Sequence, residues 1–318
     1  MIEVPDSAIR HYTAAGAWGN DTFATLLQAR ARRHPAREAL VDAANRPSFL
    51  GGAPRRLTYA QAWSEVRSLA ALLLAHGLRK DDVLCMQLPN ANEAVLTYFA
   101  CSLLGVVITP VPVQYREHEL THIVGLTRAR ALMTWRRADG ANEPLRRMMA
   151  LARSQAQPSA PTVLAWHPQA ENAACAMRHA QQEGHAALVP GGATPAQLQA
   201  LDQYLTAYPV DANETFTICW TSGTEGLPKG VPRTHNQLLV APRAVAECVE
   251  LFEGARLLNP FPLTNPGSLA GMVGPWLLTG GTLVQHQPFD LQVFLGQLRD
   301  EAIDYTCASP ALLASILQ

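Results

Sequence analysis

The sequence predicts an α/β protein with mostly parallel sheets wrapped by helices. Short apolar runs rich in β-branched residues alternate along the chain with amphipathic patterns of about ten to eighteen residues, which are typical of strands and helices. Parallel strands need crossover connections, and these are usually helical. The composition agrees, because 48% hydrophobic and 16% charged residues describe a globular chain, and 318 residues can bury a sizeable core.

Charge and cysteine content exclude several classes of protein. The formal net charge of −1 gives no electrostatic basis for binding nucleic acid or an anionic membrane, and it suits an enzyme of small molecules. The six cysteines lie far apart without metal-ligand spacing, so we expect reduced thiols in a cytoplasmic protein. The apolar stretch 95–113 is interrupted by Gly105, Pro110 and Pro112, which favours a buried helix followed by a strand over a membrane span.

In the first half of the chain, capping residues mark helix starts, and glycine or proline marks helix ends. Asn20 or Asp21 can cap a helix that Pro35 closes, and Thr58 can cap a long amphipathic helix that Gly77 ends. The expected helices are 20–33, 58–77, 90–104, 116–127 and 144–153. The expected strands are 38–42, 83–88, 106–109, 131–135 and 162–166. Residues 46–56, rich in glycine and proline, are expected to form a loop.

The pattern is weakest between about 138 and 207, where residues 190–192 and the nearby His185 are predicted to form a surface loop. Further on, Thr234 can cap a helix that Pro242 should kink or delay. The expected helices are 195–207, 234–252, 268–278, one between 285 and 303, and 310–318. The expected strands are 216–220, 231–233, 256–259, 282–285 and 303–308. Because the last helix is apolar and has no cap or linker, we expect the chain to be cut short within it.

The segment 221–230, Thr-Ser-Gly-Thr-Glu-Gly-Leu-Pro-Lys-Gly, has the composition of a phosphate-binding loop. Its glycines allow positive φ and let backbone N–H groups converge on an anion. Its hydroxyl side chains add donors, and Lys229 adds a mobile positive charge. The spacing differs from G-x-x-x-x-G-K-[ST], because Gly230 follows the lysine, and from G-x-G-x-x-G. We interpret the segment as a cradle for a polyphosphate, with a plain turn between two strands as the alternative.

These residues carry a resemblance to a known family. Residues 221–230 are similar to the phosphate-binding signature of the adenylate-forming superfamily, which includes acyl-CoA and aryl-CoA synthetases and the adenylation domains of peptide synthetases. Residues 231–236 resemble the continuation in aryl-acid and acyl-CoA ligases, and residues 57–59 and 103–110 resemble two upstream landmarks. The resemblance covers about residues 20–318 and is weakest between about 135 and 205.

The resemblance implies a two-step reaction that uses ATP, Mg²⁺ and coenzyme A. A carboxylate attacks the α-phosphorus of Mg·ATP to give an acyl-adenylate and pyrophosphate, and the thiol of coenzyme A then displaces AMP. Thr224 and Lys229 are the candidate catalytic residues, while Glu225 fills a variable position of the signature and is expected to be solvated. No metal-ligating residue is predicted. The candidate nucleotide-binding residues are Thr221, Ser222, Gly223, Thr224, Glu225, Gly226 and Lys229.

The resemblance also indicates where the carboxylic acid would bind. Residues 260–267 match the strand that lines the acyl pocket in the family, and Thr264 and Asn265 are the candidate polar groups there. In the family the proline is usually followed by an aromatic residue, then an aromatic residue or histidine, and then histidine, whereas in this chain Pro262 is followed by Leu263, Thr264 and Asn265. This departure leaves the acid and the thiol acceptor open. His235 is a further candidate for substrate binding, with a structural role at the start of a helix as the alternative.

By the same resemblance, residues 1–318 form an incomplete N-terminal adenylation domain with stacked sheets in two lobes. Lobe one is expected at about 57–205, and lobe two at about 19–50 plus 206–318. The C-terminal lid domain, which carries a catalytic lysine in the family, is absent, so we expect the chain alone to be nearly inactive. A carrier protein is the alternative acceptor, and a homodimer is left open. A non-catalytic nucleotide-binding fragment and a phosphotransferase are the alternatives of another class, but the sequence has no visible partner aspartate for the latter.

Overall fold

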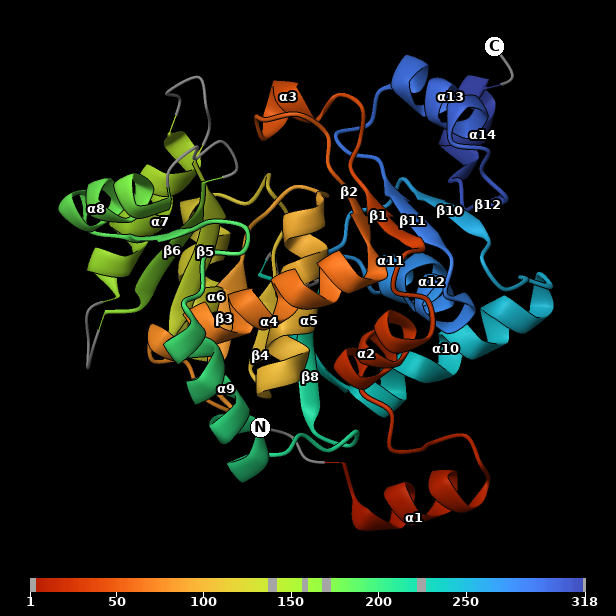
Figure 1. Cartoon of the computed structure of the whole chain (residues 1–318), viewed down its shortest axis with the longest axis horizontal. Coiled ribbons are helices and arrows are strands. Elements are labelled where there is room, and N and C mark those ends of the chain that lie inside the picture. Colours follow the sequence, from red (N-terminus) through yellow and green to blue (C-terminus); the bar gives the residue numbers. More distant parts are fainter. Residues whose placement is uncertain (1–3, 137–141, 156–159, 168–172, 222–226, 317–318) are drawn as a thin grey trace.

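The computed structural model describes residues 4–136, 142–155, 160–167, 173–221 and 227–316, and its described strands form two sheets (Figure 1). The seven-stranded sheet consists, in spatial order, of β7 (Ala186–Leu188), β6 (Thr162–Trp166), β5 (Ala131–Trp135), β3 (Val83–Met86), β4 (Val107–Pro110), β8 (Thr215–Thr221) and β9 (Lys229–Thr234). The five-stranded sheet consists of β12 (Tyr305–Thr306), β10 (Arg256–Asn259), β11 (Thr282–Gln285), β1 (Glu38–Val41) and β2 (Arg56–Thr58).

Most neighbouring strands run parallel, as the sequence predicts. Antiparallel pairing is confined, among the described strands, to β1 with β2 and to β8 with β9. Strands β3, β4 and β5 are buried along their whole length, which is usual for the centre of a parallel sheet covered on both faces. The predicted fold class, mostly parallel sheets wrapped by helices, is therefore confirmed.

Helices surround the sheets and also pack between them (Figure 1). The first part of the chain contains α1 (Asp6–Ala14), α2 (Phe23–Arg33), α3 (Arg46–Phe49), α4 (Tyr59–Ala75), α5 (Asn92–Leu104), α6 (Glu117–Thr127), α7 (Glu143–Ser154), α8 (Ala173–Glu183) and α9 (Pro195–Ala207). The second part contains α10 (His235–Cys248), α11 (Pro266–Ser268), the π-helical turn η1 (Leu269–Val273), α12 (Gly274–Thr279), α13 (Leu291–Asp300) and α14 (Pro310–Ile316).

Helices α4 and α5 join the two sheets. Helix α4 contacts β1 and β2 of the five-stranded sheet, whereas α5 contacts β4 of the seven-stranded sheet. All residues of α5 except Leu103 are buried, as expected for a helix that is apolar on every side. Tyr59 of α4 stacks on Trp276 of α12 at a centroid distance of 5.9 Å and donates a hydrogen bond of 2.9 Å to the carbonyl of Gly281. These contacts bring the two halves of the chain into one core.

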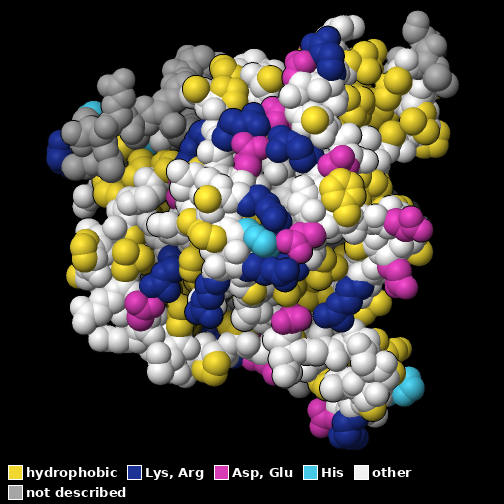
Figure 2. All heavy atoms as spheres, turned by 45° about the vertical axis from the view of Figure 1, so that its right-hand side comes forward, with side chains coloured by type: hydrophobic (Ala, Val, Ile, Leu, Met, Phe, Trp, Pro, Cys, Tyr) yellow, Lys and Arg dark blue, Asp and Glu magenta, His cyan; other side chains and the backbone are white. Residues whose placement is uncertain are grey.

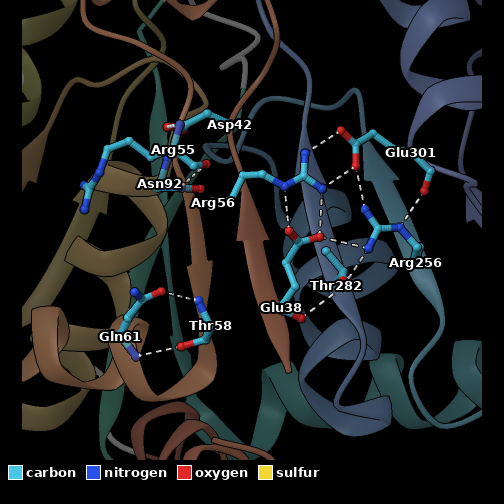
Figure 3. A network of polar contacts seen from close by, with 10 residues as sticks. All are labelled: Glu38, Asp42, Arg55, Arg56, Thr58, Gln61, Asn92, Arg256, Thr282 and Glu301. Carbon is cyan, nitrogen blue, oxygen red and sulfur yellow. Dashed lines mark hydrogen bonds and ion pairs between the residues drawn. The ribbon is translucent and has the colours of Figure 1, made fainter. Parts of the chain in front are cut away.

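Threonines cap several of the helices. The N–H of Gln61 donates to the hydroxyl of Thr58 while the N–H of Thr58 donates to the Gln61 side chain, which forms a reciprocal capping box (Figure 3). The caps predicted at Thr58 and Thr234 are confirmed. Helix α2 is capped by Thr22, one residue after the predicted Asp21, because the Thr22 hydroxyl reaches the N–H of Thr25.

Several segments differ from the sequence-based expectation, among them the helices α1 and α8, which were not predicted. Residues 46–56, expected as a loop, contain α3 and the start of β2. The segment containing His185, expected as surface loop, leads into β7, and the residue is only 7% exposed. Strand β7 has three residues and pairs with β6, so it is too short to leave a periodic signal in the sequence.

Charged side chains of both signs are interspersed over the face in Figure 2, with no extended patch of one sign. On the five-stranded sheet, Arg56 and Arg256 each pair with both Glu38 and Glu301, which links β1, β2, β10 and the end of α13 (Figure 3). Within the described parts of the chain, no helix is long and apolar enough to cross a membrane.

The membership of strands in the two sheets differs in one respect from the predicted lobes. Strands β8 and β9 were expected in lobe two, but β8 pairs with β4 and β9 pairs with β8, so both belong to the seven-stranded sheet. The division into lobes at 57–205, and at 19–50 plus 206–318, stays a prediction.

Candidate functional site

The predicted phosphate-binding segment connects the two strands of an antiparallel hairpin. Thr221 at the end of β8 faces Lys229 at the start of β9, and Trp220 faces Gly230. The predicted residues Ser222, Gly223, Thr224, Glu225 and Gly226 lie outside the described part of the chain. What the structure places is the pair of strand ends from which these residues extend.

Thr221 and Lys229 are both exposed at the open end of the hairpin. The Thr221 hydroxyl donates a hydrogen bond of 3.4 Å to the Lys229 carbonyl, so the two backbones are held together here. Among the described residues, no carboxylate forms an ion pair with the Lys229 ammonium. An exposed lysine at a hairpin end that also carries a hydroxyl residue fits a phosphate group, because both side chains can donate hydrogen bonds and the lysine carries positive charge.

Gly230 is required by the close approach of two side chains from β8. A Cβ atom at this position would lie 2.9 Å from Cγ2 of Ile218 and 3.1 Å from the ring of Trp220. The hairpin therefore needs a residue without a side chain directly after Lys229. This gives the final glycine of the signature a packing reason.

The hairpin is also connected to its neighbours through side chains. The indole Nε1 of Trp220 donates a hydrogen bond of 2.6 Å to the hydroxyl of Thr109, in β4. Nε2 of His122, in α6, lies 3.2 Å from the carbonyl oxygen of Pro228. The rings of His122 and Trp220 meet edge to face, with centroids 6.5 Å apart.

His235, a candidate for substrate binding, is 1% exposed at the first position of α10. Its ring stacks on Phe216 at 4.5 Å and lies 6.0 Å from the ring of Phe23. Burial lowers the pKa of His235 to about 3, because the charged imidazolium would lose its water. The ring is therefore neutral at physiological pH, and contact with a substrate would require a neighbouring side chain to move.

Thr264 and Asn265, the candidates for the acid pocket, follow β10 in a short turn. Thr264 is half-buried, and Asn265 is exposed and accepts a 2.8 Å hydrogen bond from the N–H of Gly267 as the cap of α11. The residues just before them are held firmly. The Asn90 side chain donates to the Phe261 carbonyl at 2.7 Å and accepts from the Leu263 N–H at 2.9 Å, so this turn is bound to the segment that precedes α5.

The structure thus places Thr221 opposite Lys229. The proposed roles of His235, Thr264 and Asn265 in substrate binding stay predictions. Sequence reasoning did not name Asn90, Thr109 and His122 as supporting residues. Asn90 and His122 belong to no motif noted in the sequence, and Thr109 lies in the landmark 103–110 without having been assigned a role there. In the described parts of the chain, no three His, Cys, Asp or Glu side chains group as a metal site.

The two sheets have the arrangement of the N-terminal part of adenylate-forming enzymes. The family model described as "AMP-binding enzyme" matches residues 27–318, so the chain belongs to this family. A solved structure titled "Mycobacterium smegmatis MbtA apo structure" has the same fold, with a TM-score of 0.74 and 23% sequence identity, and the match covers 98% of this chain and 52% of that one.

Individual relatives differ in the thiol acceptor that their names imply. The chain is 30% identical to pyochelin synthase PchD of Pseudomonas aeruginosa (strain UCBPP-PA14), over 97% of this chain and 50% of PchD. It is 28% identical to 2-hydroxy-7-methoxy-5-methyl-1-naphthoate–CoA ligase of Streptomyces carzinostaticus, over 100% and 53%. It is 27% identical to the salicyl-AMP ligase / salicyl-S-ArCP synthetase of Mycobacterium tuberculosis (strain H37Rv), over 98% and 51%. The chain spans about half the length of these relatives.

Proposed function

We propose that the β8–β9 hairpin binds the triphosphate of Mg·ATP, and that the complete protein converts a carboxylic acid to an acyl-adenylate with release of pyrophosphate. The observation that carries this proposal is the pairing of Thr221 and Lys229 at the exposed end of the hairpin. Family membership supports it, because the matching family is that of AMP-binding enzymes and one relative is named a salicyl-AMP ligase.

The chemistry follows from the charge on the reacting groups. A carboxylate is a poor acyl donor because its leaving group would be an oxide, whereas AMP is a good leaving group from the mixed anhydride. The negative charge of the departing pyrophosphate has to be stabilised, and fixed donors do this best in a pre-organised site. Thr221, Ser222, Gly223, Thr224 and Gly226 would donate to the β- and γ-phosphates, and Lys229 would add its charge. Mg²⁺ would arrive with the nucleotide as part of the substrate.

For the second step we propose coenzyme A as the thiol acceptor, with a carrier protein as the alternative. The name of the naphthoate–CoA ligase supports the first acceptor, and the name of the salicyl-S-ArCP synthetase supports the second. In either case the acid would bind near Thr264 and Asn265, in the turn that Asn90 holds. His235 stays a candidate for this pocket.

Because the relatives are about twice as long as this chain, we also propose that efficient catalysis needs the further region that they possess. The chain would then act as the larger, nucleotide-binding part of the enzyme. The lobe boundaries given above are part of this proposal.

Release of AMP and pyrophosphate tests the function directly. A full-length protein that contains this chain is incubated with ATP and short, long and aromatic acids, and AMP is measured. Lys229→Ala and Thr224→Ala should each slow AMP release by at least about tenfold, as expected when a charge-assisted contact to phosphate is lost. Lys80→Ala is the matched control, since Lys80 pairs with Glu214 at 2.6 Å.

Three results would contradict the proposal. Unchanged AMP release in both variants would remove the hairpin from the site. ADP as the product would indicate a phosphotransferase. Nucleotide binding without any exchange of pyrophosphate into ATP would indicate a non-catalytic binding module.

A further inference from the structure

We propose that His122 and Thr109 are positioning residues that hold the two ends of the phosphate-binding hairpin, and that nucleotide affinity depends on them. This inference rests on the proposed function of the hairpin. Neither residue belongs to the signature 221–230, and both come from elements earlier in the chain, α6 and β4. Each makes one hydrogen bond to the hairpin, and the two bonds lie on opposite sides of the loop.

Thr109 binds the end of β8, the strand that leads into the phosphate-binding segment. Strand β8 pairs with β4 at a single position, Ile108 with Thr217, and its last residues run beyond this pair. The indole of Trp220 then provides the next connection, through its 2.6 Å hydrogen bond to the Thr109 hydroxyl. Thr109 is fully buried at 0% exposure, so its hydroxyl is a fixed acceptor. This side-chain contact therefore links the end of β8 to β4 beyond the last backbone pair of the two strands.

His122 binds the residue that directly precedes β9, the strand that follows the phosphate-binding segment. Pro228 immediately precedes Lys229 and has no N–H, so its carbonyl is its one backbone hydrogen-bonding group. That carbonyl lies 3.2 Å from Nε2 of His122. Since a carbonyl only accepts, Nε2 must carry the proton. Among the described strands, β9 is the outermost of its sheet and pairs only with β8.

The two contacts support each other. The His122 ring meets the Trp220 ring edge to face, with an interplanar angle of 69°. Loss of either hydrogen bond would therefore loosen the packing of the other. Fixed strand ends leave less conformational freedom to be lost when a ligand binds between them, so these contacts should lower the entropic cost of binding a triphosphate.

The test uses variants that separate hydrogen bonding from packing. His122→Phe keeps an aromatic ring beside Trp220 but cannot donate to Pro228, whereas His122→Gln keeps a donor. Thr109→Val removes the acceptor at similar volume, and Thr109→Ser keeps it. His34→Phe is the matched control, because His34 pairs with Glu253 on another part of the surface.

Two measurements are made on the 318-residue chain. Isothermal titration with Mg·ATP and with tripolyphosphate gives the affinity, and amide hydrogen exchange of peptides from β8 to β9 without ligand reports on the hairpin itself. We expect His122→Phe and Thr109→Val to weaken binding about five- to tenfold, as for one lost hydrogen bond, and to speed exchange in the hairpin. His122→Gln, Thr109→Ser and His34→Phe should stay close to the wild type, and urea midpoints should change little.

The outcomes distinguish this inference from the function on which it rests. If the wild-type chain binds triphosphate and the variants bind equally well, or if rescue by glutamine and serine fails, the positioning role is overturned while the nucleotide site stands. If the wild-type chain binds neither ATP nor tripolyphosphate, the proposed function is overturned and the inference falls with it, even where exchange in the variants is faster.

Discussion

The guanidinium of Arg46 donates two hydrogen bonds, of 2.7 and 2.8 Å, to the carboxylate of Glu93. Both side chains are almost completely buried, and they join α3 to the start of α5. Asp42 accepts a further 2.8 Å hydrogen bond from the same guanidinium. The Arg46 charge holds the pKa of Glu93 below its usual range against the effect of burial, whereas burial and the Glu93 charge raise the pKa of Asp42 to about 6.

Removing Arg46 should be strongly destabilising, because it leaves buried carboxylates without their cation. We expect Arg46→Met to lower the free energy of unfolding by about 3–5 kcal/mol in urea denaturation. Arg299→Met is the control, since Arg299 and Asp300 pair on the surface, and it should leave the urea midpoint almost unchanged. Equal effects of the two substitutions would show that the buried cluster is not needed for stability.

His235 should make stability depend on pH. Its pKa is about 3 in the folded chain against an ordinary value of 6.5, so below pH 6.5 the unfolded chain takes up a proton that the folded chain refuses. The stabilising contribution is complete above pH 6.5 and is lost as the pH falls toward 3. Between pH 7.5 and pH 5, His235→Phe should therefore lose about 2 kcal/mol less stability than the wild type. Urea denaturation at both pH values measures this, and identical losses would contradict it.

The two lysines of the chain, Lys80 and Lys229, should differ in reactivity. Lys80 donates to Glu214 at 2.6 Å and to the Pro209 carbonyl at 2.7 Å, whereas Lys229 is exposed. An amine-acylating reagent should therefore modify Lys229 faster, as measured by peptide mass spectrometry. Mg·ATP should slow the modification of Lys229 and leave that of Lys80 unchanged, which makes Lys80 the internal control. Equal protection of both lysines, or of neither, would argue against a phosphate contact at Lys229.

Gly230 should not tolerate a side chain. Alanine there would press on Ile218 and Trp220, so we expect Gly230→Ala to cost about 1–3 kcal/mol and to weaken triphosphate binding. Gly125 offers a control of opposite sign, because it lies inside α6 and an added Cβ would come no nearer than 3.7 Å to a neighbour. Gly125→Ala should stabilise the chain by up to about 1 kcal/mol. If both substitutions act alike, close packing of the hairpin is not the reason for Gly230.

Much of the fold could be predicted because glycine and proline residues mark the boundaries between helices and strands. Strands 131–135, 162–166, 256–259 and 282–285 have the predicted bounds, and so does helix 195–207. Two of the misses are short: α3 has four residues and β7 has three, so neither completes a recognisable period. Helix α8, with eleven residues, was missed in the part of the chain where the pattern is weakest. Helix α1 at the start of the chain was also missed.

The supporting contacts of the candidate site could not be predicted in this way. Thr109 and Trp220 are separated by 111 residues, and their contact depends on β8 lying next to β4. Periodicity indicates that both are strands but not which strands pair, because many pairings bury the same apolar residues. The roles of Thr221, Lys229, His235, Thr264 and Asn265 stay predictions.

The sequence by itself determined the class of fold and the family, because both depend on local patterns: the alternation of strands and helices, and a loop of hydroxyls, glycines and one lysine. The tertiary structure alone decided which distant side chains meet. It placed the hairpin against β4 and α6, bound the 261–263 turn to Asn90, and buried His235 among phenylalanines. The physical reason is that hydrogen bonds and burial depend on distance in space, which the order of residues along a chain does not specify.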